Sequence, residues 1–119
     1  MTKNSKVIVS PTLPRVPLEV NGKEYFLVFD FNAIVAAEQL TGMNLLTSLD
    51  FSQLSATTLR ALLYAALLRV QPDMTLEAAG SLLRIGTVAK VMKALGEAFA
   101  ESHAEPDDEP KNDQQPEKN

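Results

Sequence analysis

The chain of 119 residues has no cysteine, no tryptophan and a single histidine, His103. Without cysteine there is no disulfide framework and no thiolate chemistry, which fits a reducing compartment. His103 has no second histidine or cysteine with which to form a metal site or a nucleophile–base pair. The five glycines are isolated from one another, so the sequence has no glycine-rich phosphate loop. We therefore expect a protein that is not an enzyme and that needs no cofactor and no metal.

An excess of positive charge and long apolar runs are also missing. Residues 1–104 hold nine acidic and nine basic side chains, so the net charge of −4 arises from residues 105–119. A neutral domain lacks the basic surface typical of proteins that bind nucleic acid or anionic membranes. No apolar run approaches the length of a membrane span, and the apolar residues 7–9 are too few for a signal-peptide core. We expect a protein with neither nucleic-acid nor membrane partners.

The strongest helical pattern runs from residue 55 to residue 70, and the rest of the chain is expected to pack around it. Ser55 is suited to be its N-cap, and Pro72 ends it. The broad apolar face has helical spacing and consists of Leu59, Leu62, Leu63, Ala66, Leu67 and Val70. A narrower strip on the opposite side consists of Ala61, Tyr64, Ala65 and Leu68. This strip is either covered by the chain itself or left for a partner.

Residues 16–30 have the pattern of a β-hairpin. Asn21 and Gly22 form the preferred two-residue turn, because both positions need a positive φ. This turn pairs Val16 with Leu27, Leu18 with Tyr25, Glu19 with Glu24, and Val20 with Lys23. One face of the hairpin is apolar, but the other face also carries Phe26 and Val28. We expect this excess of apolar residues to pack on the helices, on another strand or on a neighbouring subunit.

A short helix is expected at residues 31–42. Asp30 or Asn32 is suited to cap its start, and Gly42 to close its end. Glu38 lies beside the apolar stripe of this helix. We interpret Glu38 as a boundary residue, with its stem packed and its carboxylate in water.

Two further helices are expected in the second half of the chain. The first runs from residue 76 to about residue 85, is capped by Thr75 and contains Gly80, whose small size would let another helix approach closely. The second covers residues 88–102 and is capped by Thr87. These two helices are expected to complete the core.

The same helix pair could also form a DNA-binding helix-turn-helix. Its second helix, however, offers only Lys90 and Lys93 as basic side chains, within a neutral domain. A recognition helix needs more groups that read bases and bind phosphates. Two helices packed on a common core is the better interpretation.

These patterns predict an α+β fold that is mainly α, with an N-terminal β-hairpin packed on a bundle of about four to five short helices. Residues 16–103 form the single folded domain, in which residues 43–54 are an apolar connector. Residues 1–15 are expected to be a flexible arm. Residues 104–119 contain three prolines and no large apolar side chain, so we expect them to be a disordered acidic tail.

Three segments together resemble the tail assembly chaperones of long-tailed phages and of related gene transfer agents. They read EYFLVFDFNAIVAAEQLTGMNLL, LRALLYAALL and PDMTLEAAGSLL. The matching positions are Phe29-Asp30, Asn32-Ala33, Glu38, Gly42, Leu59-Arg60, Leu62-Leu63-Tyr64 and Thr75-Leu76-Glu77. The resemblance covers about residues 16–100 and departs from the family at Ala78, where a second acid is common.

The resemblance implies a non-enzymatic assembly factor in the host cytoplasm that is absent from the mature virion. Such proteins bind the helical tape measure protein, keep it soluble, help tail tube subunits to polymerise around it, and tend to form homo-oligomers. Binding of long apolar helical stripes requires a matching apolar surface. The expected partner-binding residues are Phe26, Val28, Tyr64 and Leu68. The alternative is a structural tail or connector subunit of the virion.

Overall fold

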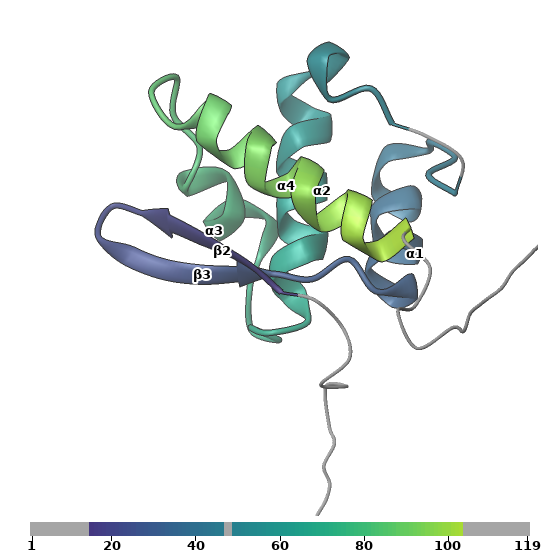
Figure 1. The fold of residues 1–119 in the computed structure, drawn as a ribbon, viewed down its shortest axis with the longest axis horizontal. Coiled ribbons are helices and arrows are strands. Elements are labelled where there is room, and N and C mark those ends of the chain that lie inside the picture. Colours follow the sequence, from purple (N-terminus) through teal and green to yellow (C-terminus); the bar gives the residue numbers. More distant parts are fainter. Residues whose placement is uncertain (1–14, 47–48, 104–119) are drawn as a thin grey trace, which may run out of the picture.

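The computed structural model describes residues 15–46 and 49–103, and its elements follow the expected order (Figure 1). They are β2 (Val16–Val20), β3 (Lys23–Leu27), α1 (Phe31–Thr41), the 3-10 turn η1 (Phe51–Gln53), α2 (Ala56–Leu68), α3 (Leu76–Ser81) and α4 (Val88–His103). This confirms the mainly α fold with an N-terminal hairpin. Two predictions concern residues outside these ranges. They are the flexible arm at residues 1–15, of which only Arg15 is described, and the disordered tail at residues 104–119.

The hairpin has the predicted turn and register. Asn21 and Gly22 have φ values of 57° and 78°, as a two-residue turn requires. The cross-strand pairs are Val16–Leu27, Pro17–Phe26, Leu18–Tyr25, Glu19–Glu24 and Val20–Lys23. Alternate residues of β2 are buried, and β2 contacts α4 while β3 contacts α2. The hairpin therefore packs on the helices through one face, as its alternation predicts.

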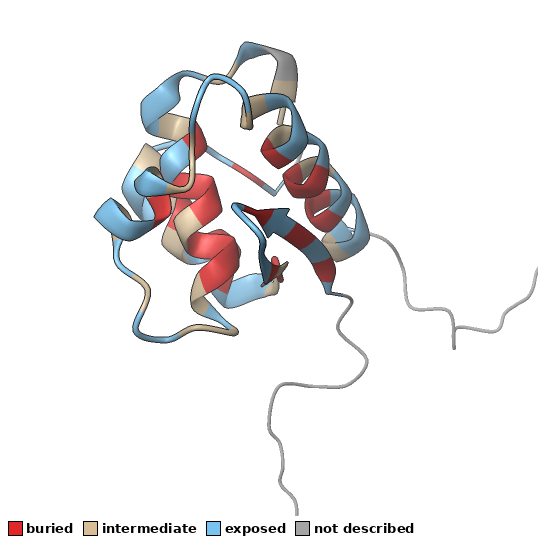
Figure 2. Ribbon diagram, turned by 90° about the vertical axis from the view of Figure 1, so that its left-hand side faces the viewer, coloured by how far each residue is buried: buried red, intermediate tan, exposed pale blue. Residues whose placement is uncertain are grey.

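Helix α2 lies at the centre and contacts α1, α3, α4 and β3 (Figure 1). Its predicted N-cap is confirmed, because the Thr58 amide donates to Ser55 Oγ at 3.2 Å. The buried stretches of the ribbon gather in the interior and the outer turns are exposed (Figure 2). The predicted broad face forms the core: Leu62, Leu63 and Leu67 have no exposed surface. Much of the stability of the fold must therefore come from packing against α2.

The end of α2 differs from the prediction by two residues. Helix α2 ends at Leu68, before Val70. The amides of Val70 and Gln71 both donate to the Leu67 carbonyl, at 3.1 and 2.9 Å, which tightens the last turn. The Ala66 carbonyl accepts instead from the Val28 amide, at 3.0 Å. The hairpin thus satisfies a carbonyl that the helix end leaves unpaired.

The predicted length of the next helix is wrong. Thr75 caps α3 as expected, but α3 ends at Ser81 and not near residue 85. The amides of Leu82 and Leu83 donate to carbonyls three residues earlier, in a tight turn. Residues 82–87 therefore form a loop, and Ile85 lies outside any helix.

Thr87 ties this loop together. Its hydroxyl accepts from the Arg84 amide at 2.9 Å and lies 3.2 Å from the carbonyls of Leu82 and Arg84. The loop backbone is closed further by the Thr87 and Val88 amides, which both donate to the Arg84 carbonyl. The hydroxyl expected to cap α4 thus fixes the conformation of residues 82–87.

Gly80 allows the close approach expected of it. A Cβ atom added at Gly80 would lie 2.8 Å from Cδ and 3.4 Å from Cγ of Arg60, on α2. The aliphatic part of the Arg60 side chain therefore covers the backbone of α3 at this point. Any larger residue at position 80 requires Arg60 to move.

Candidate functional site

The described residues do not suggest a chemical site. No group of three or more histidine, cysteine, aspartate or glutamate side chains among them could hold a metal ion. None of the helices in the described ranges is long and apolar enough to cross a membrane. The features that remain to be explained are surfaces.

The four predicted partner-binding residues differ in their accessibility. Val28 is 1% exposed and so offers no surface to a partner. Phe26, Tyr64 and Leu68 are half-buried, and Tyr64 packs against the core. Ala61, on the same strip of α2 as Tyr64 and Leu68, is buried. The chain therefore covers much of this strip, and only its half-buried side chains remain partly accessible.

A more exposed apolar surface lies on α1 and on the segment that follows it. Six large apolar side chains are exposed in the described ranges, and five of them lie between residues 31 and 46. We call these five the α1 surface: Phe31 (65% exposed), Val35 (37%), Leu40 (45%), Met43 (36%) and Leu46 (54%). Phe31 and Val35 are four residues apart and so share one side of the helix, whereas Leu40, nine residues after Phe31, lies on the other side. Helix α1 lies at the end of the molecule opposite the hairpin turn (Figure 1).

The sequence groups Phe31, Ile34 and Val35 on one face, but only Ile34 of these three is buried. The side of α1 that meets the core carries Ala33 and Ala37, which are 2% and 0% exposed. Small side chains let α1 approach α2 closely, and the larger residues then point away. The two alanines are the signal in the sequence that could have identified this surface.

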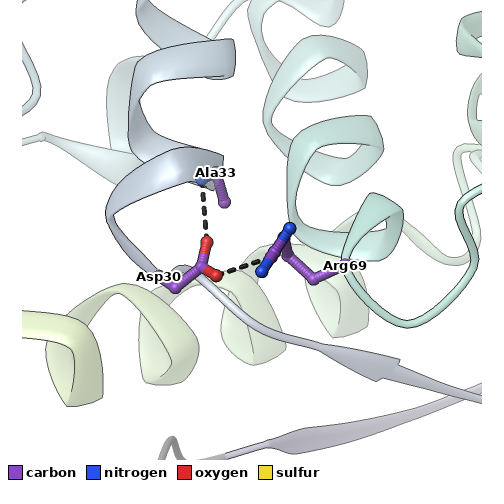
Figure 3. A network of polar contacts seen from close by, with 3 residues as sticks. All are labelled: Asp30, Ala33 and Arg69. Carbon is purple, nitrogen blue, oxygen red and sulfur yellow. Dashed lines mark hydrogen bonds and ion pairs between the residues drawn. The ribbon is translucent and has the colours of Figure 1, made fainter. Parts of the chain in front are cut away.

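Asp30 fixes the start of α1 (Figure 3). One carboxylate oxygen accepts from the Ala33 amide at 2.9 Å, so Asp30, and not Asn32, is the N-cap of the two that the sequence allows. The other oxygen accepts from Nε of Arg69, the C-cap residue of α2. A single side chain therefore caps α1 and joins its first turn to the end of the central helix.

Glu38 and His103 fix the segment after α1. The Glu38 carboxylate accepts from the Leu45 amide at 2.9 Å, and the Leu45 carbonyl lies 3.2 Å from Nε2 of His103. The Leu45 side chain has no exposed surface. Leu45 is thus anchored through both its backbone groups and its side chain, and the neighbouring Leu46 is displayed outward. Glu38 has a half-buried position, as the sequence indicates, but its carboxylate has a definite structural partner.

Gly42 and Thr41 shape the turn that leaves α1. Gly42 has a φ of 73°, and its amide donates to the Glu38 carbonyl at 2.8 Å. The Thr41 hydroxyl donates to the Ala37 carbonyl at 2.8 Å and accepts from the Met43 amide at 3.1 Å. The α1 surface therefore rests on a backbone that is held in place before any partner arrives.

The outer edge of β3 is a second unpartnered feature. In the observed register, the backbone groups of Glu24 and Phe26 point away from β2. They make no backbone hydrogen bond with any other described residue. On the opposite edge, Pro17 has no amide proton and the Glu19 carbonyl accepts from Lys90 Nζ at 2.7 Å. The edge beside the half-buried Phe26 is therefore the one open to a further strand.

Comparison of the chain with protein-family models, with curated proteins and with solved structures finds no match. The function is therefore argued from two sources, the resemblance of three sequence segments and the surfaces described above. The more exposed of these surfaces is the α1 surface.

Proposed function

We propose that this chain is a non-enzymatic tail assembly chaperone of a long-tailed phage or a related gene transfer agent. It binds the tape measure protein, keeps it soluble and promotes assembly of the tail tube around it. The contact is made by the α1 surface, with the half-buried Phe26, Tyr64 and Leu68 as secondary candidates. The protein acts in the host cytoplasm and is not retained in the mature virion.

The observation that carries the proposal is the exposed apolar area of the α1 surface. Full burial of one exposed large apolar side chain is worth roughly 1.5–3 kcal/mol, and because these five are 36–65% exposed, each would gain part of that on binding. An apolar helical stripe is the kind of partner that such a surface binds. Tape measure proteins of the family that the sequence resembles present such stripes.

The residues that hold the α1 surface in place also support the proposal. Asp30 caps α1, Glu38 anchors Leu45, and Gly42 closes the helix. All three are positions at which the sequence resembles the chaperone family. The resemblance therefore includes the backbone frame of the proposed contact as well as the core.

Co-expression with the tape measure protein of the same genome tests this function. We expect the wild-type chain to keep the tape measure protein in the soluble fraction and to be retained with it on an affinity column. Val35→Glu should abolish both effects, because it places a charge in the α1 surface. Ile85→Glu is the matched control, because it makes the same kind of change at an exposed residue of another element.

The results separate three explanations. If Val35→Glu keeps the tape measure protein soluble as well as wild type does, the α1 surface is not the contact. If Leu68→Glu folds normally and alone loses binding, the contact is the α2 strip. If purified virions contain the chain in fixed stoichiometry, the structural tail or connector subunit is the better assignment.

A further inference from the structure

The hairpin leaves one of its two edges open to a further strand. On the β2 edge, Pro17 has no amide proton and the Glu19 carbonyl accepts from Lys90 Nζ. On the β3 edge, the backbone groups of Glu24 and Phe26 point away from β2 and make no backbone hydrogen bond with another described residue. Main-chain hydrogen bonds at such an edge can hold an extended segment in place.

The exposed face of the hairpin indicates the chemistry of that segment. Glu19 and Glu24 lie directly opposite each other, and neither forms an ion pair within residues 15–46 and 49–103. Like charges in this position destabilise a pair of strands. Phe26 lies two residues after Glu24, on the same face, and is half-buried. The edge therefore suits a strand with a basic side chain that is followed two positions later by a large apolar one.

Residues 6–9 of the chain itself have this pattern. They read Lys6-Val7-Ile8-Val9. In an extended chain Lys6 and Ile8 share one face, and the two valines share the other. The three β-branched residues also favour a strand.

We propose that residues 6–9 add to the outer edge of β3 as the third strand of this sheet. The added strand lies parallel to β3, because its end at Val9 must be near the open end of the hairpin, where β2 begins at Val16. The sheet then has the order β2, β3 and the added strand, all within one copy of the chain.

The length of the intervening chain allows this path. With Val9 level with the end of β3, the link to Val16 crosses two strand spacings, about 10 Å. Residues 10–15 can span up to about 20 Å, so the link has enough slack to cross the exposed face of the hairpin. Pro11 and Pro14 lie in this link, where no amide proton is needed.

The added strand matches both features of the edge. Lys6 lies beside Glu24 and places a positive charge next to the two carboxylates. Ile8 lies beside Phe26 and covers it. The backbone hydrogen bonds run from the amides of Glu24 and Phe26 to the carbonyls of Ser5 and Val7, and from the amides of Val7 and Val9 to the carbonyls of Glu24 and Phe26. The strand thereby closes an edge that would otherwise favour aggregation.

The third strand and the tape measure contact are independent of each other. The strand covers Phe26, which is only a secondary candidate for that contact, and leaves the α1 surface free. The sequence pattern predicts a flexible arm over residues 1–15, because it does not show that an edge of the hairpin stays open.

Amide hydrogen exchange, measured by NMR on the full chain, tests the proposal with the variant Val7→Pro. Proline at this position removes the amide that donates to the Glu24 carbonyl and turns its ring toward β3. The Glu24 and Phe26 amides should exchange about tenfold more slowly in wild type than in Val7→Pro. Thr2→Pro is the matched control, outside the added strand, and should exchange as wild type does. The Tyr25 amide, which faces β2, is the internal reference and should exchange at the same rate in all three proteins.

Three outcomes overturn the proposal. Equal exchange of the Glu24 and Phe26 amides in wild type and Val7→Pro shows that residues 6–9 do not cover the edge. An equal change at Tyr25 shows that the substitution acts on the whole hairpin and not on its outer edge. Protection that rises with protein concentration places the arm of a second copy on β3. Val7→Pro should retain binding of the tape measure protein, so failure of either proposal leaves the other standing.

Discussion

Truncation of Leu63 tests the assignment of the core most directly. Leu63 lies in the middle of α2 and has no exposed surface. Leu63→Ala removes three buried carbon atoms, worth about 0.8 kcal/mol each in transfer free energy, and leaves a cavity whose cost adds to that sum. Because α2 is enclosed by α1, α3, α4 and β3, its surroundings have little freedom to collapse. We expect the free energy of unfolding to fall by about 3–4 kcal/mol.

The assay is urea unfolding at 25 °C, followed by circular dichroism at 222 nm. The midpoint should fall while the slope with urea stays unchanged, since the fold and the area exposed on unfolding stay the same. The thermal midpoint should fall by about 12–30 °C, given ~4–8 °C per kcal/mol for a domain of this size.

Leu40→Ala is the matched control for this measurement. It is the same substitution in a helix, but at a residue that is 45% exposed. Leu40→Ala should lower the free energy of unfolding by less than ~1 kcal/mol, because no cavity is formed. Equal losses for the two variants would refute the assignment of Leu63 to the core.

Three further stability predictions follow from individual contacts and from the tail. Asp30→Ala should lower the free energy of unfolding, measured in urea, by about 1–2 kcal/mol. Asp30→Asn should lower it less, because an asparagine still caps the helix. Equal decreases for the two variants would mean that the cap is unimportant. In the wild-type background, Gly80→Ala should raise the free energy of unfolding by less than the ~1 kcal/mol that helix propensity alone would give, because Arg60 must move. In an Arg60→Ala background the same substitution should gain more of that amount. A double-mutant cycle that shows no coupling would contradict the contact between these two residues. Removal of residues 105–119 should leave the thermal midpoint within about 2 °C, because the segment has no large apolar side chain to bury; a larger fall in a thermal melt would show that it packs on the domain.

The sequence determined the features that depend on local geometry. The Asn21-Gly22 turn needs two positive φ values, and this requirement also set the hairpin register. Ser55 and Thr75 cap helices because their hydroxyls reach amides only three residues away. The broad face of α2 could also be predicted from the sequence, because six apolar residues at helical spacing can be shielded from water only by packing.

Only the tertiary structure decided which apolar residues remain on the surface. The sequence pointed to Val28 for a partner, but the backbone bond from Val28 to Ala66 places it at the end of α2, where its side chain is buried. The sequence pattern also predicted a helix that included Ile85, whereas the Thr87 hydroxyl holds that segment as a loop. Both outcomes depend on contacts between segments or turns that periodicity does not encode.

The α1 surface illustrates the same physical limit. A helical pattern gives the angle between side chains, but it does not say which side faces the core. Helix α1 packs against α2; the small Ala33 and Ala37 are buried, and Phe31 and Val35 are left outside. That choice is made by how closely two helices can approach, and the approach distance is a property of both helices together.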